Sequence, residues 1–168
     1  MAKDGPAQTA SIVSIADLLA QGESTSIEFK GTLRTNLHTG EKDFRMEMGI
    51  LKTIAAFLNS HGGMLIVGVM DDGNPVGVEA DKFENDDKML LHLDNLIKER
   101  IGAQHSLHIQ PRFDDYQDKK VLAVECKKGK VPVFVKDGNV ERFFVRGGAS
   151  TTELSGSQTQ EFIRQRFV

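Results

Sequence analysis

Four acidic residues and one lysine stand close to the ends of two short apolar segments. Glu23 and Glu28 bracket the start of an alternating segment that ends at Lys30. Asp71 and Asp72 directly follow a run of apolar residues. If the two segments form neighbouring strands, three or four carboxylates could meet, which is the ligand set that Mg²⁺ or Mn²⁺ prefers. Two such ions can cleave a phosphodiester, and the lysine could stabilise developing negative charge.

The same residues also have an ordinary structural explanation. Asp71 to Asn74 is a good turn sequence, because Asp, Gly and Asn all favour turns. Glu28 and Lys30 could form a surface ion pair, which contributes little to stability. On the residues alone, the metal site and the structural explanation therefore both stay open.

A second group of residues could bind phosphate. Residues 1–97 hold 8 Lys/Arg and 15 Asp/Glu, a net charge of −7, whereas residues 98–146 hold 11 and 7, a net charge of +4. A basic segment favours a polyanionic partner, although both segments could equally be solvated faces. The candidate nucleic-acid contacts are Lys127, Lys128, Lys130, Arg142, Arg146, Ser150 and Thr151.

Several classes of site and location are not expected. The glycines at 62, 63 and 68 match neither nucleotide-binding loop signature, so ATP is not an expected cofactor, and they indicate close packing at a helix–strand junction. One cysteine and five histidines without paired spacing do not predict a zinc site. Cys126 is expected in the core, and a single cysteine favours a reducing, cytoplasmic location. No apolar run is long enough to span a bilayer.

The elements that would position these residues follow from hydrophobic periodicity. Apolar residues spaced by three and four predict helices over 44–59 and 86–101. The uninterrupted apolar run 64–70 predicts a strand covered on both faces, and alternation predicts a short strand over 27–30. Between them, residues 31–43 carry no periodicity and are expected to form a loop.

The rest of the chain adds mainly hairpins. We expect a disordered tail over 1–11, a short helix after Ser14, strands over 76–78, 106–114, 120–127, 131–135 and 140–146, a loop over 147–152, and a helix over 158–167. Hairpins outnumber strand–helix–strand units. The sequence therefore predicts an α+β fold over residues 12–168, a single domain with one mixed, mainly antiparallel sheet and helices packed on it.

These motifs together resemble a known family. Residues 23–30, 52–73 and 76–78, followed by 131–135 and 143–151, are similar to the Schlafen-type AlbA-like domain, also called the DNA-binding or divergent AAA domain. The resemblance covers about residues 14–167. It implies an α+β fold and association with nucleic acid. Bacterial members are mostly regulators, and many carry a winged-helix segment that this sequence does not contain.

The resemblance also assigns roles to residues. Animal Schlafen relatives cleave transfer and ribosomal RNA with a metal-binding acidic triad, which falls here on Glu23, Glu28 and Asp72, with Asp71 as the alternative third ligand. Lys30 falls on the lysine of the same motif. Three hypotheses follow: a nucleic-acid-binding domain, with RNA or DNA as its partner; a Mg²⁺- or Mn²⁺-dependent RNA endonuclease; or a protein-interaction module, such as one that forms a homodimer.

Overall fold

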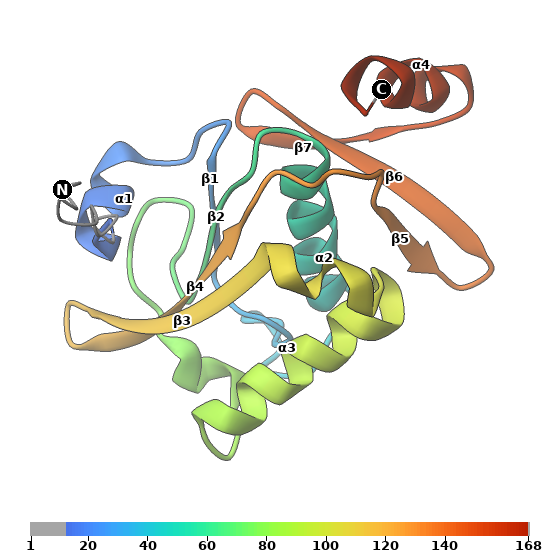
Figure 1. Ribbon diagram of the computed structural model, residues 1–168. Helices are drawn as coiled ribbons and strands as arrows, with labels where there is room; N and C mark the ends of the chain where they lie inside the picture. Colours follow the sequence, from blue (N-terminus) through green and yellow to red (C-terminus); the bar gives the residue numbers. More distant parts are fainter. Residues whose placement is uncertain (1–12, 168) are drawn as a thin grey trace, which may run out of the picture.

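The computed structural model describes residues 13–167, so the tail predicted over 1–11 lies outside the described residues. The chain folds into two sheets with helices packed on them, which confirms the α+β class (Figure 1). The helical elements are α1 (Ile15–Gln21), α2 (Phe44–Asn59), α3 (Asp86–Arg100) and α4 (Ser157–Arg166), with 3-10 turns η1 (Val78–Asp81) and η2 (Ala103–His108). Between residues 13 and 167, no helix is long and apolar enough to cross a bilayer.

The first sheet has the strand order β1-β2-β4-β3. Its strands are β1 (Ile27–Lys30), β2 (Gly63–Val67), β3 (Ile109–Tyr116) and β4 (Lys119–Cys126). β1 is parallel to β2, and the other pairs are antiparallel. Leu65 and Val67 pack into the core that contains α2, whereas Ile66 packs into a second core on the other face, with α1. The prediction that this strand is covered on both faces is confirmed.

The second sheet corrects the prediction of one sheet. It consists of β5 (Phe134–Asp137), β6 (Val140–Gly147) and β7 (Ser150–Leu154), all antiparallel. The segment 147–152 is not a loop, because β6 and β7 pair Val145 with Thr152 and are joined by a tight turn. The β-branched threonines of this segment suit a strand, and the glycines before them form its turn.

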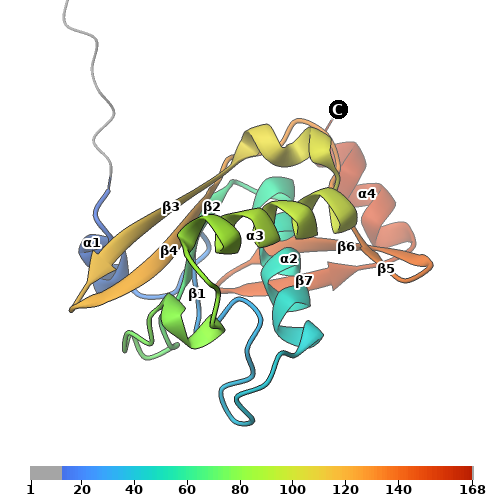
Figure 2. The same cartoon turned by 90° about the horizontal axis from the view of Figure 1, so that it is seen from below.

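Helix α2 lies between the two sheets and holds them together (Figure 1). Its bounds confirm the helix predicted over 44–59, and its stripe of buried residues faces both sheets. At its end, the fully buried Asn59 side chain donates to the carbonyl oxygens of Val133 (2.8 Å) and Phe144 (2.9 Å). The same side chain accepts from the N–H of Val133, so one amide joins α2 to the second sheet. α3 packs on α2, and α4 covers the second sheet (Figure 2).

The glycines around β2 fit tight backbone contacts. A Cβ on Gly62 would lie 2.6 Å from the carbonyl oxygen of Cys126, and one on Gly63 would lie 2.5 Å from the Phe57 ring. The predicted packing role of these glycines is therefore confirmed, and Cys126 is buried as predicted. The strand predicted over 76–78 is wrong: a single bridge joins Val69 to Pro75, and the chain then enters η1.

Candidate functional site

The acidic residues approach one another because the chain reverses before β1. The N–H of Ser24 donates to the carbonyl oxygen of Ile27, and Glu23 Oε1 accepts from the N–H of Phe29 at 3.1 Å. Glu23 therefore lies beside β1 instead of beyond its start. Partial burial raises the pKa of Glu23, and the carboxylates of Glu28 and Asp71 raise it further. The negative charges of Glu28 and Asp71 therefore act on Glu23.

This raised pKa gives a prediction for the Glu23→Gln variant. The folded protein holds the Glu23 proton to a higher pH than the unfolded chain, so ionisation of Glu23 lowers the free energy of unfolding as pH rises above about 4.5. Glutamine cannot ionise but can still accept from Phe29. We expect the stability of the variant relative to wild type to increase from pH 4 to pH 7, measured by urea unfolding. A constant difference would contradict the assigned shift.

Glu28 is already paired. Its Oε2 accepts from Arg146 Nη2 at 2.8 Å, and its Oε1 lies 3.6 Å from Lys30 Nζ. The Arg146 side chain is only 1% exposed and also donates to the carbonyl oxygens of Ser24 and Ile27. Arg146 comes from β6 in the second sheet, so this ion pair connects the two sheets. Arg146 is therefore a buried partner of the acidic group, the name used here for Glu23, Glu28, Asp71 and Asp72. Its predicted phosphate contact stays a prediction.

The remaining acidic residues do not complete a metal site. Asp72 accepts from the backbone N–H of Asn74 at 3.0 Å and from its side-chain amide at 2.8 Å, which closes the turn. Among the described residues, no three His, Cys, Asp or Glu side chains are placed so that they could hold a metal ion. Glu28 is paired with the buried guanidinium of Arg146, and Asp72 accepts hydrogen bonds from Asn74. With these partners, the carboxylates as placed here do not fit a divalent cation. The metal role of Glu23, Glu28, Asp71 and Asp72 stays a prediction.

Arg142 and the β6–β7 turn residues also have partners within the protein. Arg142 forms ion pairs with Asp137 (2.9 Å) and Glu153 (2.7 Å), and these carboxylates raise its pKa. Ser150 donates to the carbonyl oxygen of Gly147, and the hydroxyl of Thr151 accepts from Arg146 Nη1. Their predicted phosphate contacts stay untested, but two carboxylates already neutralise Arg142.

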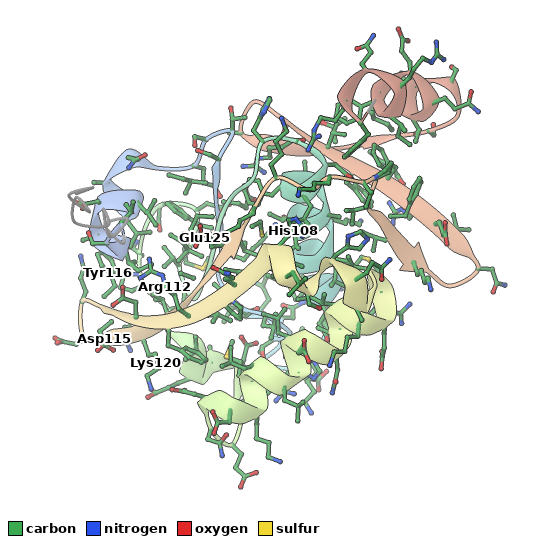
Figure 3. The ribbon with its side chains drawn as sticks, viewed as in Figure 1. His108, Arg112, Asp115, Tyr116, Lys120 and Glu125 are labelled. Carbon is green, nitrogen blue, oxygen red and sulfur yellow. The ribbon has the colours of Figure 1, made fainter. Side chains whose placement is uncertain are left out.

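Lys127, Lys128 and Lys130 form the lysine loop, named here for the segment 127–130 that follows β4. The loop lies between η2 and the end of α2. The N–H of Lys127 donates to the carbonyl oxygen of His108 in η2, and the N–H of Gly129 donates to the carbonyl oxygen of Leu58 in α2. His108 and Glu125 lie at the same end of the β3–β4 pair, away from its hairpin turn (Figure 3). All three lysines are exposed, and within residues 13–167 none forms an ion pair.

A cavity of about 320 Å³ adjoins the acidic group at Lys30. The loop 31–38 and the start of α2 line it, with Arg45 and Met70 among the contributing residues. Asp81 orders this loop, because its buried carboxylate accepts from the N–H groups of Leu33 (2.7 Å), Arg34 (2.9 Å) and Thr35 (3.0 Å). Neither Asp81 nor Arg45 lies in a sequence motif that indicates a role. No local pattern reveals a carboxylate whose donors lie 46 to 48 residues away.

Two solved structures share this fold. The DIP2311 protein from Corynebacterium diphtheriae matches with a TM-score of 0.59 and 21% identity over 84% of this chain, which spans 24% of that protein's chain. The N-terminal domain of a protein from Nitrosomonas europaea, named as related to the ATP-dependent DNA helicase RecG, matches with a TM-score of 0.54 and 22% identity, over 88% of this chain and 93% of that one.

Sequence similarity identifies the family. Residues 23–155 match the family described as Schlafen, AlbA_2. This match contains the acidic group, β2, the lysine loop and the second sheet, and it agrees with the resemblance carried by the motifs. The chain therefore belongs to the Schlafen AlbA_2 family.

Proposed function

We propose that this protein is a nucleic-acid-binding domain and that the lysine loop is its main phosphate contact. The observation that carries the proposal is the set of three exposed ammonium groups at Lys127, Lys128 and Lys130, without carboxylate partners among the described residues. Free cations on one loop release counterions from a phosphate backbone when they bind it. Membership of the Schlafen AlbA_2 family and the name of the RecG-related protein support nucleic acid as the polyanion.

Removing the three loop charges should weaken binding in a salt-dependent way. We expect Lys127→Gln/Lys128→Gln/Lys130→Gln to lower the slope of log K against log salt by about 2 for single-stranded RNA, since each lost phosphate contact contributes about 0.7. Fluorescence anisotropy with labelled RNA and DNA from 50 to 200 mM KCl measures the slope. The matched control replaces Lys42, Lys88 and Lys136, three exposed lysines on other parts of the surface, with glutamine.

The control variant should keep the wild-type slope. If both triple variants weaken nucleic-acid binding equally, binding depends only on the overall charge of the protein. The lysine loop is then not the main phosphate contact. If neither RNA nor DNA binds at 50 mM KCl, the proposed function itself is wrong, and the interaction-module hypothesis takes its place. Sedimentation velocity on the same sample then tests for a homodimer.

The acidic group gives the second candidate, a Mg²⁺- or Mn²⁺-dependent endoribonuclease. The approach of Glu23, Glu28 and Asp71 favours it, whereas the Arg146–Glu28 ion pair opposes it. We expect transfer RNA to stay intact with Mn²⁺. Cleavage that disappears in Asp71→Asn would contradict this expectation and would show that the ion pair opens. Asp71 is the suitable position because it is exposed, so its replacement leaves the core unchanged.

A further inference from the structure

We infer that a small cavity at the C-terminal end of α2 binds a phosphate group. The cavity measures about 200 Å³ and is lined by Ser60, His61, Arg146, Phe162, Gln165 and Arg166. This inference deepens the proposed function, on which it rests for the source of the phosphate, namely a bound nucleic acid. The cavity shares Arg146 with the Glu28 ion pair, and its other lining residues were not among the candidate site residues predicted from the sequence.

The lining residues offer hydrogen-bond donors and no carboxylate. The lining residues carry two guanidinium groups, an imidazole, an amide and a hydroxyl. Ser60 Oγ accepts from the backbone N–H of Arg146 at 2.9 Å, so its own hydroxyl proton is left to donate. A site of this composition favours an anion with several acceptor oxygens, and a phosphate group provides them.

Arg146 brings a donor that the protein itself does not use. Its Nη2 donates to Glu28, Ser24 and Ile27, but its Nε–H is buried and has no hydrogen-bond partner. A buried donor without a partner costs about 1–3 kcal/mol. A phosphate oxygen in the cavity that Arg146 lines would accept this hydrogen bond.

Arg166 brings the positive charge. Its Nε donates to the carbonyl oxygen of Ser60 (3.2 Å) and its Nη2 to that of Gly129 (2.8 Å), which fixes the guanidinium at the end of α2. Within residues 13–167, no carboxylate pairs with Arg166, in contrast to Arg142 on β6. The third nitrogen, Nη1, makes no hydrogen bond within the same residues, so it can donate to an anion.

The position of the cavity connects it to the lysine loop. Gly129, which accepts from Arg166, belongs to that loop, so the backbone of the lysine loop contacts a residue that lines the cavity. A nucleic-acid strand that contacts the lysine loop can therefore place one phosphate in the cavity. The Phe162 side chain, whose ring packs on Phe143, gives the cavity an apolar wall suited to a sugar ring.

The test uses inorganic phosphate as the probe and a single charge change at the rim. Gln165 is exposed on α4, so Gln165→Glu adds a carboxylate beside the cavity without disturbing the core. Gln160→Glu makes the same change on the same helix outside the cavity. Phosphate is titrated against chloride at constant ionic strength, with the amide and His61 ring signals followed by NMR. We expect saturable shifts around the cavity, weakened about tenfold by Gln165→Glu and less than twofold by Gln160→Glu.

Two results would overturn the inference: no phosphate-dependent shift at Ser60, His61 and Arg166, or equal weakening by both variants. An RNA oligonucleotide with a 5′-phosphate and the same oligonucleotide with a 5′-hydroxyl distinguish a terminal phosphate from a backbone phosphate. If RNA binds through the lysine loop but phosphate leaves the cavity unchanged, the inference fails and the proposed function stands. If phosphate binds the cavity and no nucleic acid binds the protein, the proposed function fails alone.

Discussion

Replacing Arg146 with methionine should lower the free energy of unfolding by about 3–5 kcal/mol, because it leaves the Glu28 carboxylate in a mostly buried position without its main partner. The Arg146 side chain is 1% exposed and that of Glu28 is 14% exposed. The substitution also removes the hydrogen bonds to the carbonyl oxygens of Ser24 and Ile27, which join β6 to the start of β1. The variant should therefore lose the contacts that join the second sheet to the first at the start of β1.

Arg142→Met is the matched control for this prediction. Arg142 lies four residues earlier on the same strand and pairs with two carboxylates, but its side chain is 25% exposed. Exposed ion pairs contribute less than about 1 kcal/mol, so the control should be close to wild type. Urea unfolding followed by circular dichroism measures both variants. A loss below 1 kcal/mol in Arg146→Met would show that the Arg146–Glu28 pair contributes no more than an exposed one.

A double-mutant cycle then separates the ion pair from the other contacts of Arg146. Glu28→Gln keeps the shape of the side chain and removes the charge. If the charges interact as the 2.8 Å distance indicates, the double variant should lose less stability than the sum of the single variants, with a coupling of about 1–3 kcal/mol. Additive losses would place the stabilisation in the backbone hydrogen bonds to Ser24 and Ile27.

This prediction also decides how the nuclease hypothesis can be tested. If Glu28 holds the two sheets together, Glu28→Ala will lose any activity through unfolding as well as through loss of a ligand. Asp71 is exposed and acts on Glu23 electrostatically, so its replacement changes the acidic group without removing a buried partner. A loss of activity in an Asp71 variant therefore indicates a role in cleavage. A loss of activity in a Glu28 variant could result from unfolding alone.

Local patterns predicted the elements whose residues determine their own structure. The apolar stripe from Phe44 to Leu58 defined α2. The short helix predicted after Ser14 is α1, and Ser14 caps it by accepting from the N–H of Asp17. Two short apolar segments predicted β1 and β2, and the structure pairs them, which meets the condition under which the acidic residues were expected to lie close together. The charge of Asp71 acts on Glu23 in this arrangement. These helices depend on contacts between residues that are close in sequence, and the arrangement of the acidic residues depends on a single strand pair.

Contacts between distant residues could not be predicted in the same way. Arg146 precedes two glycines at a strand end, which indicates an exposed hairpin arginine, yet its carboxylate partner lies 118 residues earlier. The second sheet was missed for a similar reason: hairpin signals identify neighbouring strands but not which sheet a hairpin joins. Asn59 could be placed at a helix end, but its bonds to Val133 and Phe144 span 74 and 85 residues.

Replacing Asp81 with asparagine should destabilise the protein by about 2–4 kcal/mol and release the loop beside the Lys30 cavity. The carboxylate is buried and accepts from three consecutive backbone N–H groups, those of Leu33, Arg34 and Thr35. A hydrogen bond to a charged group contributes about 1.5–3 kcal/mol. Asparagine keeps only one acceptor oxygen. Its NH₂ group replaces the other oxygen and cannot accept, so at least one of the three backbone N–H groups loses its partner.

The effect of Asp81→Asn should be local before it is global. Amide hydrogen exchange of Leu33, Arg34 and Thr35 should become faster than that of α2, because the loop can open while the helix stays packed between the sheets. Asp72→Asn is the control: its carboxylate also accepts two N–H groups, but the turn is exposed and asparagine suits it. If exchange in the loop stays unchanged in Asp81→Asn, then contacts other than those of Asp81 order the loop that lines the Lys30 cavity.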